Sequence, residues 1–117
     1  MPAEIKRSDK LDLHVYKIDD RMDIIIGGTP WTTIKVGETP KTLDLRTQLI
    51  AGKNTVEIKA VDTQPPFYSM DFEVIRTDAA GKTYTVWRPD PIINEPDHGQ
   101  PPDLFRDLTY DFYLVDG

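Results

Sequence analysis

Apolar and polar residues alternate along most of this 117-residue chain, and a period of two is the spacing of side chains on a β-strand with one buried face. Residues 11–16, LDLHVY, show the pattern clearly. Apolar residues do not recur at every third or fourth position over any long stretch, as an amphipathic helix would require. The chain is therefore expected to fold as a series of short strands.

About eight strands are predicted, each apolar on one side and bounded by turn residues. They cover residues 11–16, 22–26, 32–36, 43–45, 56–60, 68–74, 84–88 and 108–114. Strands this short are not stable alone, so two antiparallel sheets are expected to pack their apolar faces together in an all-β sandwich. A small closed barrel is the alternative. An α/β fold is disfavoured, because parallel strands would read as continuous apolar runs.

The length fits one domain over residues 1–117, with a single core. The chain has no cysteine, so stability must come from packing and hydrogen bonds rather than from disulfides or a thiolate metal site. The net charge of −6 and the isoelectric point near 4.8 argue against nucleic acid and anionic membrane surfaces as partners. Neutral, cationic or metal partners are expected instead.

The first residues show no targeting signal. Charged residues follow Met1 to Lys6 in place of an apolar run, and no stretch approaches the roughly 20 apolar residues that a membrane-spanning helix needs. As written, the chain is expected to be soluble and cytoplasmic, or to be an excised module of an exported protein.

One segment resembles known sandwich modules. It consists of Leu43-Asp44-Leu45, Leu49 and the stretch 52–62, GKNTVEIKAVD, in which a glycine reverses the chain and an asparagine is expected to cap the turn. The segment is similar to the penultimate strands of bacterial immunoglobulin-like and cadherin-like modules, and to the jelly-roll sugar-binding domains of some glycosidases. The resemblance covers residues 22–76 and implies a sandwich of jelly-roll or immunoglobulin-like topology, without identifying an activity.

All of the net charge lies in the last 29 residues. Thirteen acidic and thirteen basic side chains cancel over residues 1–88, whereas residues 89–117 hold seven acids and Arg106 as the one base. This part opens with a proline-rich acidic segment, residues 89–103, whose prolines exclude a helix or a central strand. A loop of this length between two strands is usually functional or disordered, and its prolines favour a pre-formed binding surface.

Two tryptophans give the main indication of a ligand. Sugars bury their apolar faces on flat aromatic rings, while their hydroxyl groups hydrogen-bond to carboxylates and amides. Trp31 and Trp87 are both out of phase with the aliphatic face of their strands, and Trp87 directly precedes Arg88 and the acidic segment. The alternative is that one or both rings cover an end of the core. The predicted ligand-binding residues are Trp31, Trp87, Arg88, Asp90, Asn94, Glu95, Asp97 and His98.

Calcium is the metal that the acidic segment favours, because calcium binds carboxylate and carbonyl oxygens on flexible loops. The predicted ligands are Glu95, Asp97 and Asp103; their spacing matches no calcium loop motif, and acidic turn residues are more often solvated or bonded to local backbone. No cofactor is otherwise required. A zinc site is disfavoured, since His14 and His98 are the only histidines and His14 is expected on the outer side of its strand.

The chain is not expected to be an enzyme, because it lacks cysteine and no serine lies in a strained glycine-flanked turn. The first hypothesis is a lectin-like carbohydrate-binding module, with calcium as an assisting ion. The second is a protein-interaction or assembly module, including a homo-oligomer, in which the acidic tail faces a basic partner or an edge strand extends another sheet. The third is a small hydrolase or isomerase that uses carboxylates of the acidic segment.

Overall fold

The computed structural model describes residues 3–62, 67–96 and 103–116, with the backbone alone at 62, 67–68, 94–96 and 103–105. This part of the chain forms ten strands and one short 3-10 helix. The elements are β1 (Ala3–Lys6), β2 (Lys10–Asp19), β3 (Arg21–Ile26), β4 (Thr29–Lys35), β5 (Lys41–Asp44), η1 (Arg46–Gln48), β6 (Gly52–Asp62), β7 (Phe67–Thr77), β8 (Thr83–Trp87), β9 (Ile92–Pro96) and β10 (Asp103–Val115). Within these ranges, no helix has the length and apolar character needed to span a membrane.

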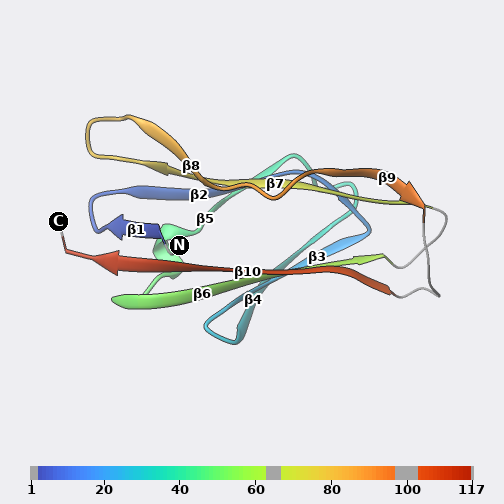
Figure 1. The fold of residues 1–117 in the computed structure, drawn as a ribbon, viewed down its shortest axis with the longest axis horizontal. Helices are drawn as coiled ribbons and strands as arrows, with labels where there is room; N and C mark the ends of the chain where they lie inside the picture. The colour runs from blue at the N-terminus through green and yellow to red at the C-terminus, as the bar shows by residue number, and fades with distance from the viewer. Residues whose placement is uncertain (1–2, 63–66, 97–102, 117) are drawn as a thin grey trace.

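The strands form two sheets that pack face to face (Figure 1). The first sheet has the order β1-β10-β6-β3-β4, and the second has the order β5-β2-β7-β8, with β9 also paired to β7. Paired strands are antiparallel except β1, which runs parallel to β10. The predicted all-β, antiparallel two-sheet sandwich is therefore confirmed.

Two strands of the structure are not predicted by the alternation. β1 has four residues, of which only Ile5 is buried, so its sequence shows too little alternation to be recognised. β9 lies inside the acidic segment, and the expectation that residues 89–103 form a loop is wrong for residues 92–96. β9 pairs with the first part of β7, while β8 pairs with the last part. Both therefore lie along one edge of the second sheet, where proline is tolerated.

The chain crosses from the second sheet to the first between β2 and β3. The backbone N–H of Asp20 donates to the Val61 carbonyl at 3.0 Å, and the Asp20 carbonyl accepts from the Val36 N–H at 2.7 Å. Before this corner, β2 pairs with β7 in the second sheet, and after it, β3 pairs with β6 in the first sheet. This corner is consequently fixed by strands on both of its sides, and it sets the register of β3 in the first sheet.

The core is the layer of side chains between the two sheets. Central strands of both sheets contribute alternate residues to it, in the phase that the sequence predicts. Its buried apolar side chains are Ile5, Leu11, Leu13, Val15, Ile18, Met22, Ile24, Ile34, Leu45, Leu49, Val56, Ile58, Ala60, Met70, Phe72, Val74, Ile92, Phe112 and Leu114. Since no disulfide is available, this layer and the strand hydrogen bonds hold the sandwich together.

Asn54 is a buried polar side chain at the start of β6, with 4% of its surface exposed. Its Oδ1 accepts from the Ile50 N–H at 2.8 Å, and its Nδ2 donates to the carbonyls of Ile50 and Gly52 at 2.8 and 3.0 Å. A longer bond of 3.4 Å reaches the Phe112 carbonyl on β10. Gly52 has φ of 89°, a conformation that favours glycine. The expected asparagine cap of this turn is confirmed.

Replacing Asn54 with alanine is expected to lower the free energy of unfolding by about 1–3 kcal/mol, because backbone groups of Ile50 and Phe112 lose a partner. Chemical denaturation at neutral pH measures the change. Gln48→Ala, at an exposed position in η1, is the control and should change stability by less than about 0.5 kcal/mol. Equal stabilities of the two variants would contradict the role given to Asn54.

Candidate functional site

Trp31 lies at a β-bulge in the β3–β4 hairpin. Ile24 pairs with Thr32 and Ile25 pairs with Pro30, so Trp31 is an extra residue with no partner on β3. A bulge breaks the alternation and changes the direction of a side chain. The ring is partly buried and contacts the core cluster. The out-of-phase position of Trp31 in the sequence is explained by this bulge.

Trp31 borders a hollow of about 390 Å³, called here the Trp31 hollow. Side chains from three adjacent strands of the first sheet reach it, several of them in the outward phase of those strands. The lining residues are Asp23, Ile24, Ile25, Pro30, Trp31, Thr32, Thr33 and Lys59. The hollow thus combines an aromatic ring with a carboxylate, hydroxyl groups and an ammonium group.

Asp23 is the carboxylate of the Trp31 hollow, and one of its oxygens is engaged by neighbours. Oδ1 accepts from the Thr33 hydroxyl at 2.9 Å and lies 3.2 Å from Nε of Arg21. Lys59 lies opposite Asp23 on β6, and its Nζ is 4.0 Å from a Glu57 oxygen. Within the described residues, Oδ2 of Asp23 accepts no hydrogen bond, and Glu57 is the one ion-pair partner of the Lys59 ammonium.

Trp87 occupies a different environment, and its expected outward position is wrong. Val74 pairs with Trp87 and Ile75 pairs with Thr85, so a bulge at Val86 shifts the alternation of β8 by one residue. The Trp87 ring consequently packs against the core. The alternative reading of this tryptophan, as a ring that covers the core, is confirmed.

The rings around Trp87 come from both sheets. Its centroid lies 5.1 Å from that of Phe72 on β7, 5.3 Å from that of Tyr110 and 6.5 Å from that of Phe112, both on β10. The Phe72 and Phe112 rings meet Trp87 edge to face, which is a favourable aromatic geometry. Trp87 therefore links the two sheets, while its part in ligand binding stays a prediction.

Arg88, the next residue, lies on the outer face of the second sheet. Its Nη2 is 3.2 Å from Oδ1 of Asp71, and its Nη1 is 3.5 Å from Oε1 of Glu73. The guanidinium also lies 5.5 Å from the centre of the Tyr16 ring. Trp87 and Arg88 thus point to opposite sides of one sheet, so they do not form the shared ligand site that their adjacent sequence positions predict.

Glu73 is the centre of the polar network on this outer face, although only 8% of its surface is exposed. It accepts hydrogen bonds from the Tyr16 hydroxyl and, at 3.2 Å, from the Thr85 hydroxyl. The bond from Tyr16 is the main cause that lowers the pKa of Glu73, and the same bond raises the pKa of Tyr16. Tyr16 is itself the extra residue of a bulge between β2 and β7.

His14 belongs to the same outer face, as expected. Its Nδ1 lies 2.9 Å from the Thr42 hydroxyl, and its ring stacks beside that of Tyr16 with an interplanar angle of 9°. The charged and polar groups of the network form hydrogen bonds and ion pairs with one another. The network therefore has a structural role.

The acidic segment is described only in part. Asp90 is exposed, and the backbone of Glu95 pairs with Tyr68, so Asn94 and Glu95 belong to β9 in the second sheet. Asp103 begins β10 in the first sheet, opposite Asp62. Asp97 and His98 lie outside the described residues, so the predictions that involve them stay predictions. The residues of the segment whose side chains are described, 89–93, do not line the Trp31 hollow.

The calcium site stays a prediction. Among the residues whose side chains are described, no group of three or more histidine, aspartate or glutamate residues is arranged to hold a metal ion. That finding does not reach the predicted ligands Glu95, Asp97 and Asp103, whose side chains are outside the described part.

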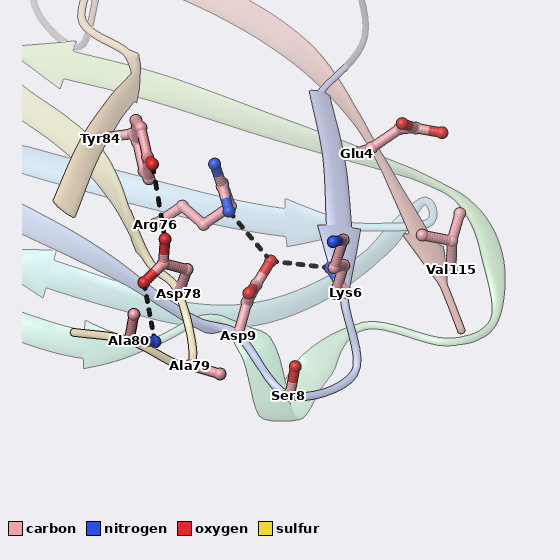
Figure 2. Close-up of a pocket in the computed structure, with 10 residues that line it drawn as sticks. All are labelled: Glu4, Lys6, Ser8, Asp9, Arg76, Asp78, Ala79, Ala80, Tyr84 and Val115. Carbon is pink, nitrogen blue, oxygen red and sulfur yellow. Dashed lines mark hydrogen bonds and ion pairs between the residues drawn. The ribbon is translucent and has the colours of Figure 1, made fainter. Parts of the chain in front are cut away.

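A larger hollow of about 690 Å³, called here the end pocket, lies where β1, the β1–β2 turn and the β7–β8 hairpin meet (Figure 2). β1 and the last residues of β10, which pair with each other, lie at this end of the sandwich (Figure 1). The lining residues are Glu4, Lys6, Ser8, Asp9, Arg76, Asp78, Ala79, Ala80, Tyr84 and Val115. None of them is among the predicted site residues.

An ion pair at the end pocket joins β7 to the β1–β2 turn. Nη1 of Arg76 lies 3.4 Å from Oδ2 of Asp9, which also accepts from the Lys6 N–H at 2.8 Å. The Arg76 guanidinium lies 4.3 Å from the centre of the Tyr84 ring. Arg76 therefore extends between Tyr84 and Asp9, as Figure 2 shows.

A signal for this ion pair exists in the sequence. Asp9 is in phase with Leu11 on β2, and Arg76 is in phase with Val74 on β7, so both charges occupy core-facing positions at strand ends. Charged side chains at such positions are rarely buried without a partner. Two charges of opposite sign in the apolar phase therefore indicate a pair that closes one end of the core.

Asp78 forms the other wall of the end pocket, in the β7–β8 turn. Its Oδ1 accepts from the N–H groups of Lys82 and Ala80 at 2.9 and 3.0 Å, and its Oδ2 accepts from the Tyr84 hydroxyl at 3.4 Å. These bonds, with that from Lys82 the largest contribution, lower the pKa of Asp78. The carboxylate is therefore charged and held by its own hairpin.

Comparisons of the chain with protein-family models, with curated proteins and with solved structures gave no match. The resemblance to bacterial sandwich modules accordingly stays a prediction. The candidate sites rest on the geometry of the chain itself.

Replacing Glu73 with glutamine is expected to lower the free energy of unfolding at pH 7 by about 1–3 kcal/mol, because the hydrogen bonds to a charged acceptor are lost. The pKa of Glu73 is lowered in the folded state, so its stabilisation is present above the unfolded-state pKa and is lost as pH falls through the folded value. The difference between the variant and the parent should therefore shrink below about pH 4.

Urea denaturation of both proteins between pH 3 and pH 8 measures this dependence. Asp12→Asn is the control, since Asp12 lies on the outer face of β2, as His14 does, and its side chain makes no hydrogen bond or ion pair within the described part of the chain. A Glu73→Gln deficit that stays constant over the whole pH range would contradict the assignment.

Proposed function

We propose that this chain is a non-catalytic carbohydrate-binding module that stacks a sugar ring on Trp31. The observation that supports the proposal most directly is that the Trp31 ring borders a hollow with a carboxylate and an ammonium group. Trp87, in contrast, packs its ring against those of Phe72, Tyr110 and Phe112. A flat aromatic surface with a few converging polar groups is the usual composition of a sugar site.

The polar groups of the Trp31 hollow match the chemistry of hydroxyl groups. A sugar hydroxyl both donates and accepts, so its site must offer both functions. Oδ2 of Asp23 accepts, because the contacts of Thr33 and Arg21 involve Oδ1. The Lys59 ammonium donates, since its one described ion-pair partner lies at 4.0 Å.

The dimensions of the hollow indicate a small ligand. Its volume of about 390 Å³ is near the lower end of the range for ligand pockets, about 300–1,000 Å³. Its neutral balance of one carboxylate and one ammonium group favours a neutral sugar. The proposed ligand is therefore a single neutral sugar ring or a short oligosaccharide. Binding at Trp31 involves none of the predicted calcium ligands, so it should not require calcium.

The assembly hypothesis receives less support from the strand edges. β1 and β5 have four residues each, β4 contains Pro30 and a bulge, and β9 ends at Pro96. Short edge strands, prolines and bulges are features that hinder pairing with another chain. A sugar in the Trp31 hollow remains the proposal that the geometry supports best.

Tryptophan fluorescence tests the proposal directly. The chain has two tryptophans, so Trp87→Phe leaves Trp31 as the only reporter. Titration of this variant with neutral mono- and oligosaccharides, with added calcium or with chelator, is expected to give a saturable change that is the same in both conditions. Trp31→Ala is expected to weaken binding of the same sugar roughly tenfold or more, about 1.4 kcal/mol.

Two further variants make the test specific. Asp23→Asn keeps the shape of the hollow and should weaken binding, whereas Lys35→Gln, an exposed position on β4 outside the lining, should bind as the parent does. Calorimetry with unlabelled sugar measures both, and thermal melting confirms that each variant is folded. Unchanged affinity in Trp31→Ala, or no response to any sugar of the panel, would overturn the proposal.

A further inference from the structure

The end pocket has a chemistry different from that of the Trp31 hollow, because it is organised around a positioned guanidinium. Arg76 comes from β7, and its side chain is 22% exposed. The Tyr84 ring centre lies 4.3 Å from the guanidinium, and Asp9, with 1% of its side chain exposed, forms an ion pair with it. A guanidinium supported by a ring and a buried carboxylate is held in one orientation before any ligand arrives.

Arg76 retains free hydrogen-bond donors. A guanidinium has five N–H groups and two edges that can each bind two oxygens. The contact with Asp9 involves Nη1 alone and is long, at 3.4 Å. Within the described residues, the Arg76 guanidinium has no other hydrogen bond, so the edge formed by Nε and Nη2 is available.

The two aspartates of the end pocket are already engaged. Asp9 accepts from Arg76 and from the Lys6 N–H, and Asp78 accepts three bonds from its own hairpin. Each carboxylate therefore has donors of its own before a ligand arrives, although both bonds to Asp9 end on Oδ2 and none of the described bonds ends on Oδ1. The third carboxylate, on Glu4, points away from Arg76 in Figure 2.

Two other groups of the end pocket are hydrogen-bond donors. The Lys6 ammonium and the Ser8 hydroxyl both line the end pocket, and the structure describes no side-chain partner for either. Together with the open edge of Arg76, they offer two positive charges and a hydroxyl to one ligand.

We infer that the end pocket binds a small ligand through a carboxylate group. A carboxylate is planar, carries one negative charge and fits one edge of a guanidinium with two parallel hydrogen bonds. A phosphate dianion fits less well, because the pocket lining holds three carboxylates beside its two cations. The ligand carboxylate binds the Nε and Nη2 edge of Arg76, and Lys6 and Ser8 bind it from β1 and the following turn.

Three probes distinguish the sources of such a carboxylate. Galacturonate represents an acidic sugar, succinate a free small acid, and triglycine a peptide C-terminus. Each is compared with its uncharged counterpart: galactose, succinamide and triglycine amide. Two-dimensional NMR of the ¹⁵N-labelled protein, including the Arg76 side-chain Nε–H, follows each titration.

At least one carboxylate is expected to shift the signals of Ser8, Arg76 and Tyr84 in a saturable way, while its counterpart binds at least fivefold more weakly. The tightest of the three probes identifies the source. Binding of a counterpart with equal affinity, the absence of binding by all three carboxylates, or shifts confined to residues outside the end pocket would overturn the inference.

Two variants locate the binding groups. Lys6→Gln removes an exposed side chain and leaves the backbone bond to Asp9 intact, so the protein should fold and bind the carboxylate at least fivefold more weakly. Arg76→Lys keeps the charge beside Asp9 but removes the two-bond edge, and it should weaken binding about tenfold. Lys10→Gln, at an exposed position outside the lining, is the control and should bind as the parent does. Parent affinity in both test variants would also overturn the inference.

This inference is independent of the sugar site. Trp31→Ala should leave carboxylate binding in the end pocket unchanged, and Lys6→Gln should leave neutral sugar binding at Trp31 unchanged. Failure of one site therefore has a different experimental signature from failure of the other.

Discussion

Burial of one face of every central strand is the constraint on which the rest of this structure depends. Without cysteines, the two sheets are held together by side chains that are removed from water, each contributing about 1.5–3 kcal/mol when a valine, leucine, isoleucine or phenylalanine is fully buried. Leu11, Leu13 and Val15 on β2 show how strictly the phase is kept, since all three are fully buried. A slip of one residue would turn the whole set toward solvent. The alternation that buries one set of side chains consequently also decides which side chains lie on the outer faces of the two sheets.

The three informative aromatic side chains mark the places where this phase changes. Tyr16 and Trp31 are the extra residues of bulges, and Trp87 follows one at Val86. The three side chains lie in different places because their neighbours differ. Trp87 packs against the core, and Trp31 borders a hollow. Tyr16 donates a hydrogen bond to Glu73 on an outer face. Bulges of this kind commonly redirect side chains at functional positions.

The strand periodicity could be predicted from the sequence because it depends on local spacing alone. The positions of Trp31 and Trp87 could not, since a bulge is defined by the partner strand and the pairing of β3 with β4 or β7 with β8 is not visible in one segment. The same limit applies to Arg88, whose partners Asp71 and Glu73 lie across the β7–β8 pair. The Asp9–Arg76 pair, in contrast, is predictable from the sequence. Each of these charged residues stands at a position where the alternation of its strand calls for an apolar side chain.

The excess negative charge of the last 29 residues is partly accounted for by β10. Asp111 accepts from the Thr55 hydroxyl at 2.7 Å and lies 3.7 Å from the Lys53 ammonium. Asp107 lies beside Glu57, and their hydrogen bond raises the pKa of Glu57. These carboxylates contact residues of β6 on the outer face of the first sheet. They therefore stabilise the pairing of β10 with β6. The two proposed sites lie instead where the regular strand pattern is interrupted, at the Trp31 bulge and at the Arg76 strand end. That is where a sandwich with a closed core can present a ligand site without disturbing its packing.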